Sequence, residues 1–68
     1  MMVFEIEILT LRNKKIVNAY KKDQLGIEYG SADDLGSLED AINFIRNRWK
    51  HNGLIRVVED GNKRIIGE

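Results

Sequence analysis

The sequence predicts an α+β fold in which a single helix packs on an antiparallel or mixed sheet of four to five strands. Three features indicate this fold: alternating apolar residues at the start of the chain, an apolar stripe of helical spacing over residues 38–49, and an Asp60-Gly61 turn between two short apolar runs. Alternation with a period of two is typical of strands, and a period of 3.6 is typical of helices. With only 68 residues, we expect residues 1–68 to form one α+β domain with the element order β-β-(β)-α-β-β.

The first predicted elements are the two strands of a hairpin. Between Val3 and Leu11 the apolar side chains at positions 4, 6 and 8 alternate with two glutamates, which indicates a half-buried strand. The alternation is lost at Leu9 and Leu11, where we expect a β-bulge or a covered outer face. Arg12-Asn13-Lys14 is predicted to form the turn, because asparagine tolerates the left-handed conformation, and residues 16–20 then return as the second strand.

A third strand before the helix is favoured over a loop. Leu25, Ile27 and Tyr29 alternate with polar or small residues, although Gly26 weakens the pattern. Without this strand, residues 22–36 would form a loop of about 15 residues, which is uncommon in so compact a domain. Two strands before the helix remain the alternative.

The helix is predicted over Ser37–Lys50. Ser37 can cap its N-terminus, and two acidic residues in the first turn suit the helix dipole. Five side chains with helical spacing form the apolar stripe expected to face the sheet: Leu38, Ala41, Ile42, Ile45 and Trp49. Gly53 is expected to take the left-handed conformation that ends the helix.

Two strands are predicted after the helix, over Leu54–Glu59 and Lys63–Gly67. Asp60-Gly61 between them is a strong signal for a tight hairpin turn. Lys63 and Arg64 place two charges on the last strand, which is a common protection of a sheet edge against aggregation.

The composition excludes several classes of protein. The chain has no cysteine, so it forms no disulfide or thiolate metal site, and a reducing compartment is allowed. No stretch approaches the roughly 18 apolar residues of a membrane helix, and the start of the chain does not resemble a secretory signal. We therefore expect a cytoplasmic protein without a membrane partner.

Few residues suggest catalysis. His51 is the only histidine, and we expect it to be a solvent-exposed residue at the helix C-terminus. Neither serine has the setting of a nucleophile, and the acidic residues of segment 33–40 lack the spacing of an EF-hand loop. The sequence therefore predicts a protein that is not an enzyme and that uses no metal or other cofactor.

The charges are balanced in number but segregated along the chain. The chain has eleven basic and eleven acidic residues, so its net charge is zero. Basic side chains dominate residues 12–22 and 46–56, whereas residues 23–40 are acidic. The candidate interaction surface comprises nine residues from the two basic blocks: Arg12, Lys14, Lys15, Lys21, Lys22, Arg46, Arg48, Lys50 and Arg56. With two strands before the helix these blocks would converge at one pole. With three strands, residues 12–15 would lie beside acidic residues of segment 33–40, which would largely cancel their charge, and a smaller basic cluster would remain at the far end: Lys21, Lys22, Arg48 and Lys50.

These features predict a small protein-interaction module that associates with a protein partner or with a second copy through a sheet edge. The last strand, Lys63–Gly67, and the apolar residues Leu9 and Leu11 are the first candidates for such contacts. The alternative is a nucleic-acid-binding regulator that uses the basic blocks 12–22 and 46–56, although a pI near 6.6 is low for that class.

One segment resembles a known family. The run Gly36–Ile42, after a β-hairpin, is similar to the N-terminal domains of HicB-type antitoxins, which are small bacterial ββ(β)αβ proteins. The similarity covers roughly half of the chain and consists mostly of a capped amphipathic helix. The Pro-rich segment with acidic residues and glycine that is expected before the helix in that family is absent here. The resemblance therefore implies an order of elements and no activity.

Overall fold

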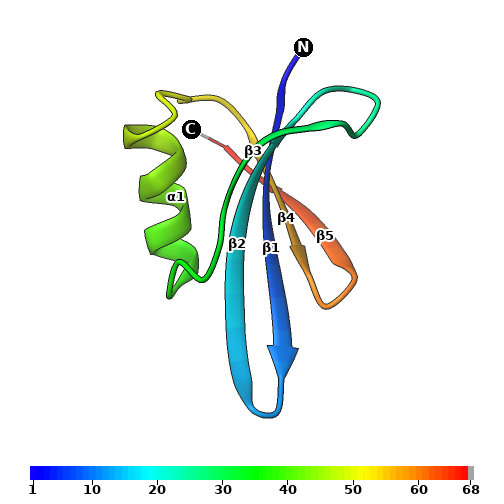
Figure 1. The fold of residues 1–68 in the computed structure, drawn as a ribbon, viewed down its shortest axis with the longest axis vertical. Helices are drawn as coiled ribbons and strands as arrows, with labels where there is room; N and C mark the ends of the chain where they lie inside the picture. The colour runs from blue at the N-terminus through cyan, green and yellow to red at the C-terminus, as the bar shows by residue number, and fades with distance from the viewer. Residues whose placement is uncertain (68) are drawn as a thin grey trace.

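The computed structural model describes residues 1–67 and contains one helix and a five-stranded mixed sheet (Figure 1). The elements are β1 (Val3–Leu11), β2 (Lys14–Lys22), β3 (Glu28–Ala32), α1 (Leu38–Asn47), β4 (Ile55–Glu59) and β5 (Asn62–Ile66). The α+β class and the element order are confirmed, with three strands before the helix.

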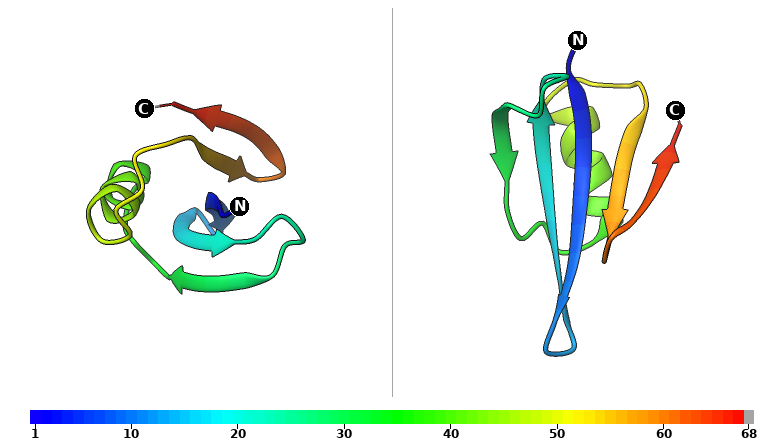
Figure 2. Two further views of the ribbon diagram at one scale, coloured as in Figure 1. Left: turned by 90° about the horizontal axis from the view of Figure 1, so that it is seen from above. Right: turned by 90° about the vertical axis from the view of Figure 1, so that its right-hand side faces the viewer.

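The strands follow the order β3-β2-β1-β4-β5 across the sheet. β1 is at the centre, antiparallel to β2 and parallel to β4, and the two outer pairs are antiparallel. β3 and β5 are therefore the two edges (Figure 2, right).

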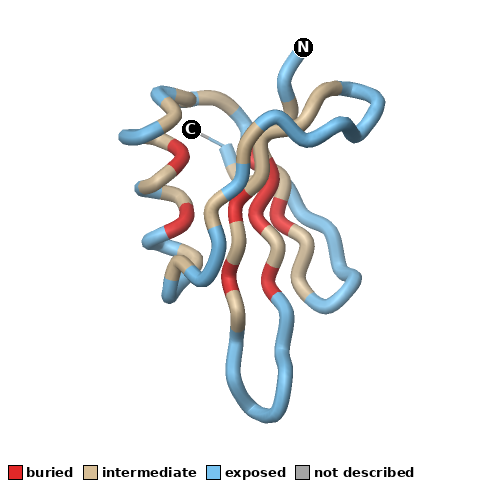
Figure 3. Tube along the Cα trace, in the orientation of Figure 1, coloured by how far each residue is buried: buried red, intermediate tan, exposed pale blue. Residues whose placement is uncertain are grey.

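The core lies between the helix and one face of the sheet. Its buried side chains come from the three central strands and from one side of the helix (Figure 3). They are Ile6, Ile8, Val17, Ala19, Ala41, Ile45, Ile55 and Val57. The other stripe residues, Leu38, Ile42 and Trp49, are half-buried against this cluster. The apolar stripe thus faces the sheet as expected.

The helix begins as predicted and ends earlier. Ser37 is the N-cap, and its Oγ accepts a hydrogen bond from the Asp40 backbone N–H at 3.0 Å. The helix ends at Asn47, and the left-handed residue after it is Lys50, with φ 56°, rather than Gly53. The expectation for Gly53 was wrong. The guanidinium of Arg46 donates to the carbonyls of His51 and Gly53, which holds the following segment in a turn.

The third strand lies later in the chain than expected. It covers Glu28–Ala32, whereas the alternating residues at positions 25 and 27 lie in a loop. The Asp23 carboxylate accepts the backbone N–H groups of Leu25 and Ile27, both at 2.9 Å, and so folds this loop back on itself. The same bonds, first that from Ile27, hold the pKa of Asp23 below its ordinary value of 3.8. Local hydrogen bonding therefore overrides the apolar alternation.

The hairpin turns both use two left-handed residues. Arg12 and Asn13 have φ of 51° and 65°, so Lys14 belongs to the second strand and not to the turn. Asp60 and Gly61, with φ of 48° and 89°, form the predicted turn between β4 and β5. The β1–β2 pairing continues without interruption to its end, and the bulge in the sheet lies instead between Lys21 and Lys22. No bulge explains the apolar residues at the end of β1.

Truncating the helix at its buried centre should destabilise the whole fold. Ile45→Ala removes a side chain with no exposed surface, so we expect a loss of about 2–5 kcal/mol in the free energy of unfolding, measured by urea denaturation. The matched control is Leu25→Ala, at a side chain that is 86% exposed, which should change stability by less than about 0.5 kcal/mol. Equal effects of the two variants would show that the helix does not anchor the core.

Candidate interaction surface

No other element of residues 1–67 covers the face of the sheet opposite the helix. In the right panel of Figure 2 the helix lies behind the sheet and this outer face points toward the viewer. Because side chains alternate between faces, the residues beside Glu5 in the register share this face with it. The row across the sheet is Tyr20, Glu5, Arg56 and Ile65.

The centre of the outer face is a carboxylate whose two oxygens both form ion pairs. Glu5 is only 8% exposed although no layer covers it. Its Oε1 accepts the Arg56 Nη2 at 2.7 Å and Nε at 2.9 Å, and its Oε2 lies 3.2 Å from the Lys22 Nζ. Charge-assisted bonds of this kind are stronger than neutral ones. The two cationic side chains therefore shield Glu5 from water and hold three strands together.

A second polar pair adjoins this centre. The Tyr20 hydroxyl donates to Glu7 Oε1 at 3.0 Å, across the β1–β2 pairing. Burial of the phenol, followed by its hydrogen bond to Glu7 and the charge of that carboxylate, raises the pKa of Tyr20 above its ordinary value of 10.0. Each cause disfavours the phenolate. The ring of Tyr20 is also in contact range of the Lys22 ammonium, 5.1 Å from its centroid.

Apolar residues flank the polar centre in two places. The first, here called the arm patch, consists of Leu9, Leu11 and Ile16, of which the two leucines are exposed. The second, the edge patch, consists of Leu54 and Ile65, with exposed fractions of 63% and 60%. The arm patch and Ile65 lie on the outer face by alternation along their strands, and Leu54 directly precedes β4, two positions before the outer-face residue Arg56.

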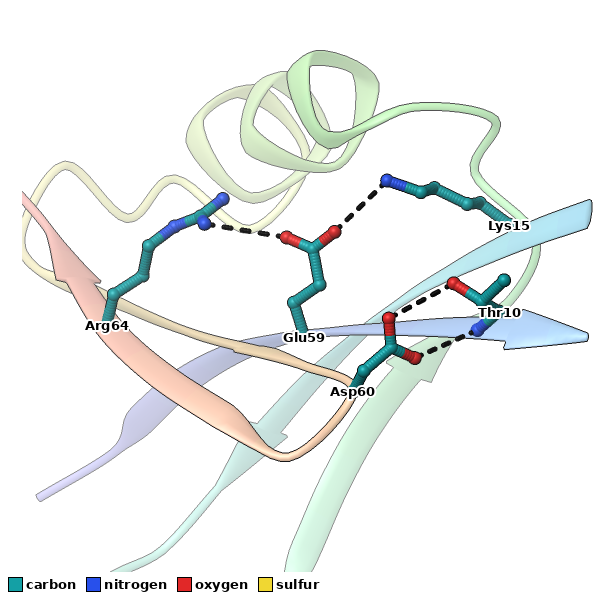
Figure 4. A network of polar contacts seen from close by, with 5 residues as sticks. All are labelled: Thr10, Lys15, Glu59, Asp60 and Arg64. Atoms are coloured by element: carbon teal, nitrogen blue, oxygen red, sulfur yellow. Dashed lines mark hydrogen bonds and ion pairs between the residues drawn. The ribbon is translucent and has the colours of Figure 1, made fainter.

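The arm patch belongs to a hairpin that projects beyond the rest of the sheet. In Figures 1 and 3 the ends of β1 and β2 extend past the other strands, and their residues are exposed. Asp60 fixes the base of this arm, because its carboxylate accepts both the backbone N–H and the hydroxyl of Thr10, at 3.2 and 3.1 Å (Figure 4). Beside it, the Glu59 carboxylate forms ion pairs with Lys15 Nζ at 3.1 Å and with Arg64 Nη1 at 3.4 Å.

Several basic residues of the predicted surface have structural roles. Lys22 and Arg56 bind Glu5, and Lys15 binds Glu59. Arg46 donates to three backbone carbonyls, those of His51, Gly53 and Gly67. These four side chains stabilise the fold, and their charges are compensated by acidic or carbonyl oxygens.

The remaining basic residues lie at two ends of the molecule. Arg12 and Lys14 are at the tip of the arm, which lies toward the N-terminal end of the helix (Figure 1). Arg48 and Lys50 follow the C-terminal end of the helix, where Lys21 lies over the Trp49 ring at 5.5 Å. The single basic pole of the two-strand alternative is therefore not formed, because the third strand reverses the direction of the helix.

His51 differs from the expectation of an exposed side chain. It is half-buried, and its ring stacks on Phe4 with a centroid distance of 3.8 Å and an interplanar angle of 16°. Its Nε2 lies 2.9 Å from the Leu54 carbonyl oxygen. The early end of the helix turns the chain back toward β1 and places the imidazole on the core. No local sequence pattern indicates this contact, since it depends on the turn at Lys50.

The histidine and acidic residues of segment 1–67 form no metal centre. No cluster of three or more histidine or acidic residues is close enough there to hold an ion. One cleft of about 370 Å³ lies between the start of the helix and the sheet. Its lining combines apolar side chains with the ion pairs of Figure 4: Ile8, Lys15, Val17, Gly36, Ser37, Leu38, Glu59 and Arg64. The charges at its rim are already paired with one another.

The edge patch could be predicted only in part from the sequence. The last strand was predicted to offer contacts, but Leu54 and Ile65 are eleven positions apart, and only the β4–β5 register, which pairs Arg56 with Ile65, brings their segments together. The Asp60-Gly61 turn is the signal that fixes this register. Because a two-residue turn pairs the flanking positions directly, it brings residues 56 and 65 side by side.

No family model, no curated protein and no solved structure matches this chain. The resemblance to HicB-type antitoxins thus has no support from a family match. Within residues 1–67, the helix is too short and too polar to cross a membrane.

Removing the charge of Glu5 should weaken the sheet. Glu5→Gln leaves Lys22 and Arg56 without their anion, and we expect a loss of about 1–3 kcal/mol in the free energy of unfolding, measured by urea denaturation. The control is Glu28→Gln, at an exposed position of β3, which should be nearly neutral. A Glu5→Gln variant as stable as the parent chain would show that the outer face does not depend on this carboxylate.

Tyr20 should titrate above its ordinary value in alkaline solution. Because its pKa is raised in the folded chain, the unfolded state loses the phenolic proton first, so stability should decrease as pH rises above 10.0. Difference absorbance of the phenolate, with Tyr20→Phe to assign the signal, measures the pKa. Glu7→Gln should lower it toward 10.0 without restoring it fully, since burial remains the largest cause. An unchanged pKa in Glu7→Gln would contradict the role of Glu7.

Proposed function

We propose that this chain is a small, non-catalytic protein-interaction module that binds through the outer face of its sheet and the adjoining edge strand β5. The observation that carries the proposal is the pair of exposed apolar patches on a face that no other element covers. Apolar side chains gathered on one uncovered face are typical of contact surfaces. The arm patch and the edge patch flank a polar centre whose charges are already paired, so binding would not require their desolvation as separate ions.

The charge distribution supports a protein partner over a nucleic acid. Phosphate binding relies on several uncompensated cations gathered on one surface. Here four of the nine basic candidates are held by carboxylate or carbonyl oxygens, and the others are divided between the arm tip and the helix C-terminal end. A net charge of zero gives no long-range attraction to a polyanion. Nucleic-acid binding by Arg12 and Lys14 is the alternative that the experiment below separates.

A cytoplasmic location is part of this proposal. A cysteine-free sequence needs no oxidising compartment to reach a stable fold. Stability comes instead from the helix–sheet core and from the ion pairs of the outer face.

Photo-cross-linking at defined positions tests the proposal. A photoreactive residue is placed at Leu11 in the arm patch, at Ile65 in the edge patch, or at Asn43, an exposed residue on the outer side of the helix. We expect saturable protein adducts of one defined mass at position 11 or 65, and none at position 43. A glutamate beside the photoreactive residue should reduce the adduct at the same patch. The variant is Leu9→Glu for the label at position 11 and Leu54→Glu for the label at position 65.

Two outcomes would overturn the proposal. Equal labelling at Asn43 would show that contacts at the outer face are unspecific. Adducts that disappear after nuclease treatment, together with binding to labelled DNA or RNA that falls steeply with salt, would favour the nucleic-acid alternative.

A further inference from the structure

Within residues 1–67, the last strand presents a regular edge that pairs with no further strand. β5 forms the end of the sheet, and its pairing with β4 runs without a shift from Asn62 to Ile66. The opposite edge, β3, is less suitable, because the bulge between Lys21 and Lys22 distorts the pairing beside it. Figure 2 shows β5 at the side of the sheet, with no element beyond it.

The tight turn determines which backbone groups of β5 point outward. In a hairpin with a two-residue loop, the residues flanking the loop, here Glu59 and Asn62, form a hydrogen-bonded pair. Hydrogen-bonded and non-hydrogen-bonded pairs then alternate along the ladder. Lys63 and Ile65 therefore direct their N–H and C=O groups away from β4, toward the open edge.

We infer that this edge binds a second copy of the chain, with two β5 strands antiparallel about a twofold axis at Ile65. The inference rests on the proposed function and identifies its partner. A twofold axis perpendicular to the sheet lies midway between the two β5 strands. It sets one residue of β5 directly opposite its equivalent in the second copy, because opposite residues share a face. When the axis lies at Ile65, the two Ile65 residues are opposite each other, and each donates its backbone N–H to the carbonyl of the other.

The charges on β5 select this register. An axis at Lys63 or Arg64 would place two like charges directly opposite each other, which is destabilising. The axis at Ile65 places Arg64 opposite Ile66 and Lys63 opposite Gly67 of the second copy, so no like charges oppose. Axes before Lys63 would oppose the strand to the left-handed turn residues, and axes beyond Ile65 would shorten the pairing.

The edge patch gains cover in the same arrangement. Ile65, 60% exposed in the single chain, meets its equivalent on the outer face. Gly67 lies beside Leu54, since a Cβ built on Gly67 would be 3.8 Å from the Leu54 Cδ2. With no side chain at Gly67, the aliphatic stem of Lys63 from the second copy has room to pack on Leu54. Burial of these apolar side chains favours association.

Single cysteines test both the partner and the register. The chain has no cysteine of its own, so each variant carries one thiol. In Ile65→Cys the Cα atoms of the pair would be about 5.5 Å apart, which suits a disulfide. In Arg64→Cys the thiols would be displaced by two residues, about 7 Å along the strand and about 5 Å across it, which does not.

We expect Ile65→Cys to form a disulfide-linked dimer in a glutathione buffer at least about tenfold faster than Arg64→Cys or Lys63→Cys. The reason is that strand pairing raises the effective concentration of the two thiols at position 65 to the millimolar range. A mixture of Lys63→Cys with Gly67→Cys should cross-link between the two variants, whereas neither should cross-link alone. This mixture retains Ile65 and so does not depend on a variant at the twofold axis.

Other results would overturn the inference. Faster cross-linking of Arg64→Cys than of Ile65→Cys would exclude this register. A parent chain that stays monomeric by light scattering at millimolar concentration, with no variant above the Lys63→Cys rate, would exclude self-pairing. In that case photo-adducts to another protein at Ile65 would still support the proposed function, and their absence at both patches would remove it as well.

Discussion

The structure depends on the burial of one helix stripe against one face of the sheet. Ala41 and Ile45 have no exposed surface, and they belong to one buried cluster with side chains from β1, β2 and β4. Those strands come from both ends of the chain, so this contact unites the N-terminal hairpin with the C-terminal one. The described part of the chain, residues 1–67, has one helix for this purpose, whereas a sheet has two faces. The second face must therefore be stabilised by other means.

The outer face solves this problem mainly with paired charges. Glu5 is nearly as buried as a core residue although it lies under no helix, because Lys22 and Arg56 lie across it from the neighbouring strands. Tyr20 and Glu7 extend the same arrangement. Polar pairs can stabilise an uncovered sheet, but they leave the apolar residues at its margins exposed, and these margins are where the arm patch and the edge patch occur. The proposed binding surface thus follows from the small size of the core.

The accuracy of the sequence-based expectations differed between local and distant features. The Ser37 cap, the Asp60-Gly61 turn and the apolar stripe were predicted because each signal lies within a few residues. The third strand was expected too early, since the hydrogen bonds of Asp23 folded residues 23–27 into a loop despite their apolar alternation. The helix end was misplaced because the Arg46 side chain, rather than a glycine, fixes the segment that follows.

The sequence by itself determined the class of fold, the order of the elements and the absence of thiol chemistry, whereas the presence of the third strand was decided by the structure. Periodicity, capping residues and turn residues are properties of short segments, and they act before distant parts of the chain meet. Only the tertiary structure decided which charges are compensated and which apolar residues remain exposed. Glu5 and Arg56 are 51 positions apart, and they meet only because β1 and β4 are parallel neighbours. This contact depends on the register between β1 and β4, and no local pattern specifies that register, because no hairpin turn joins these two strands.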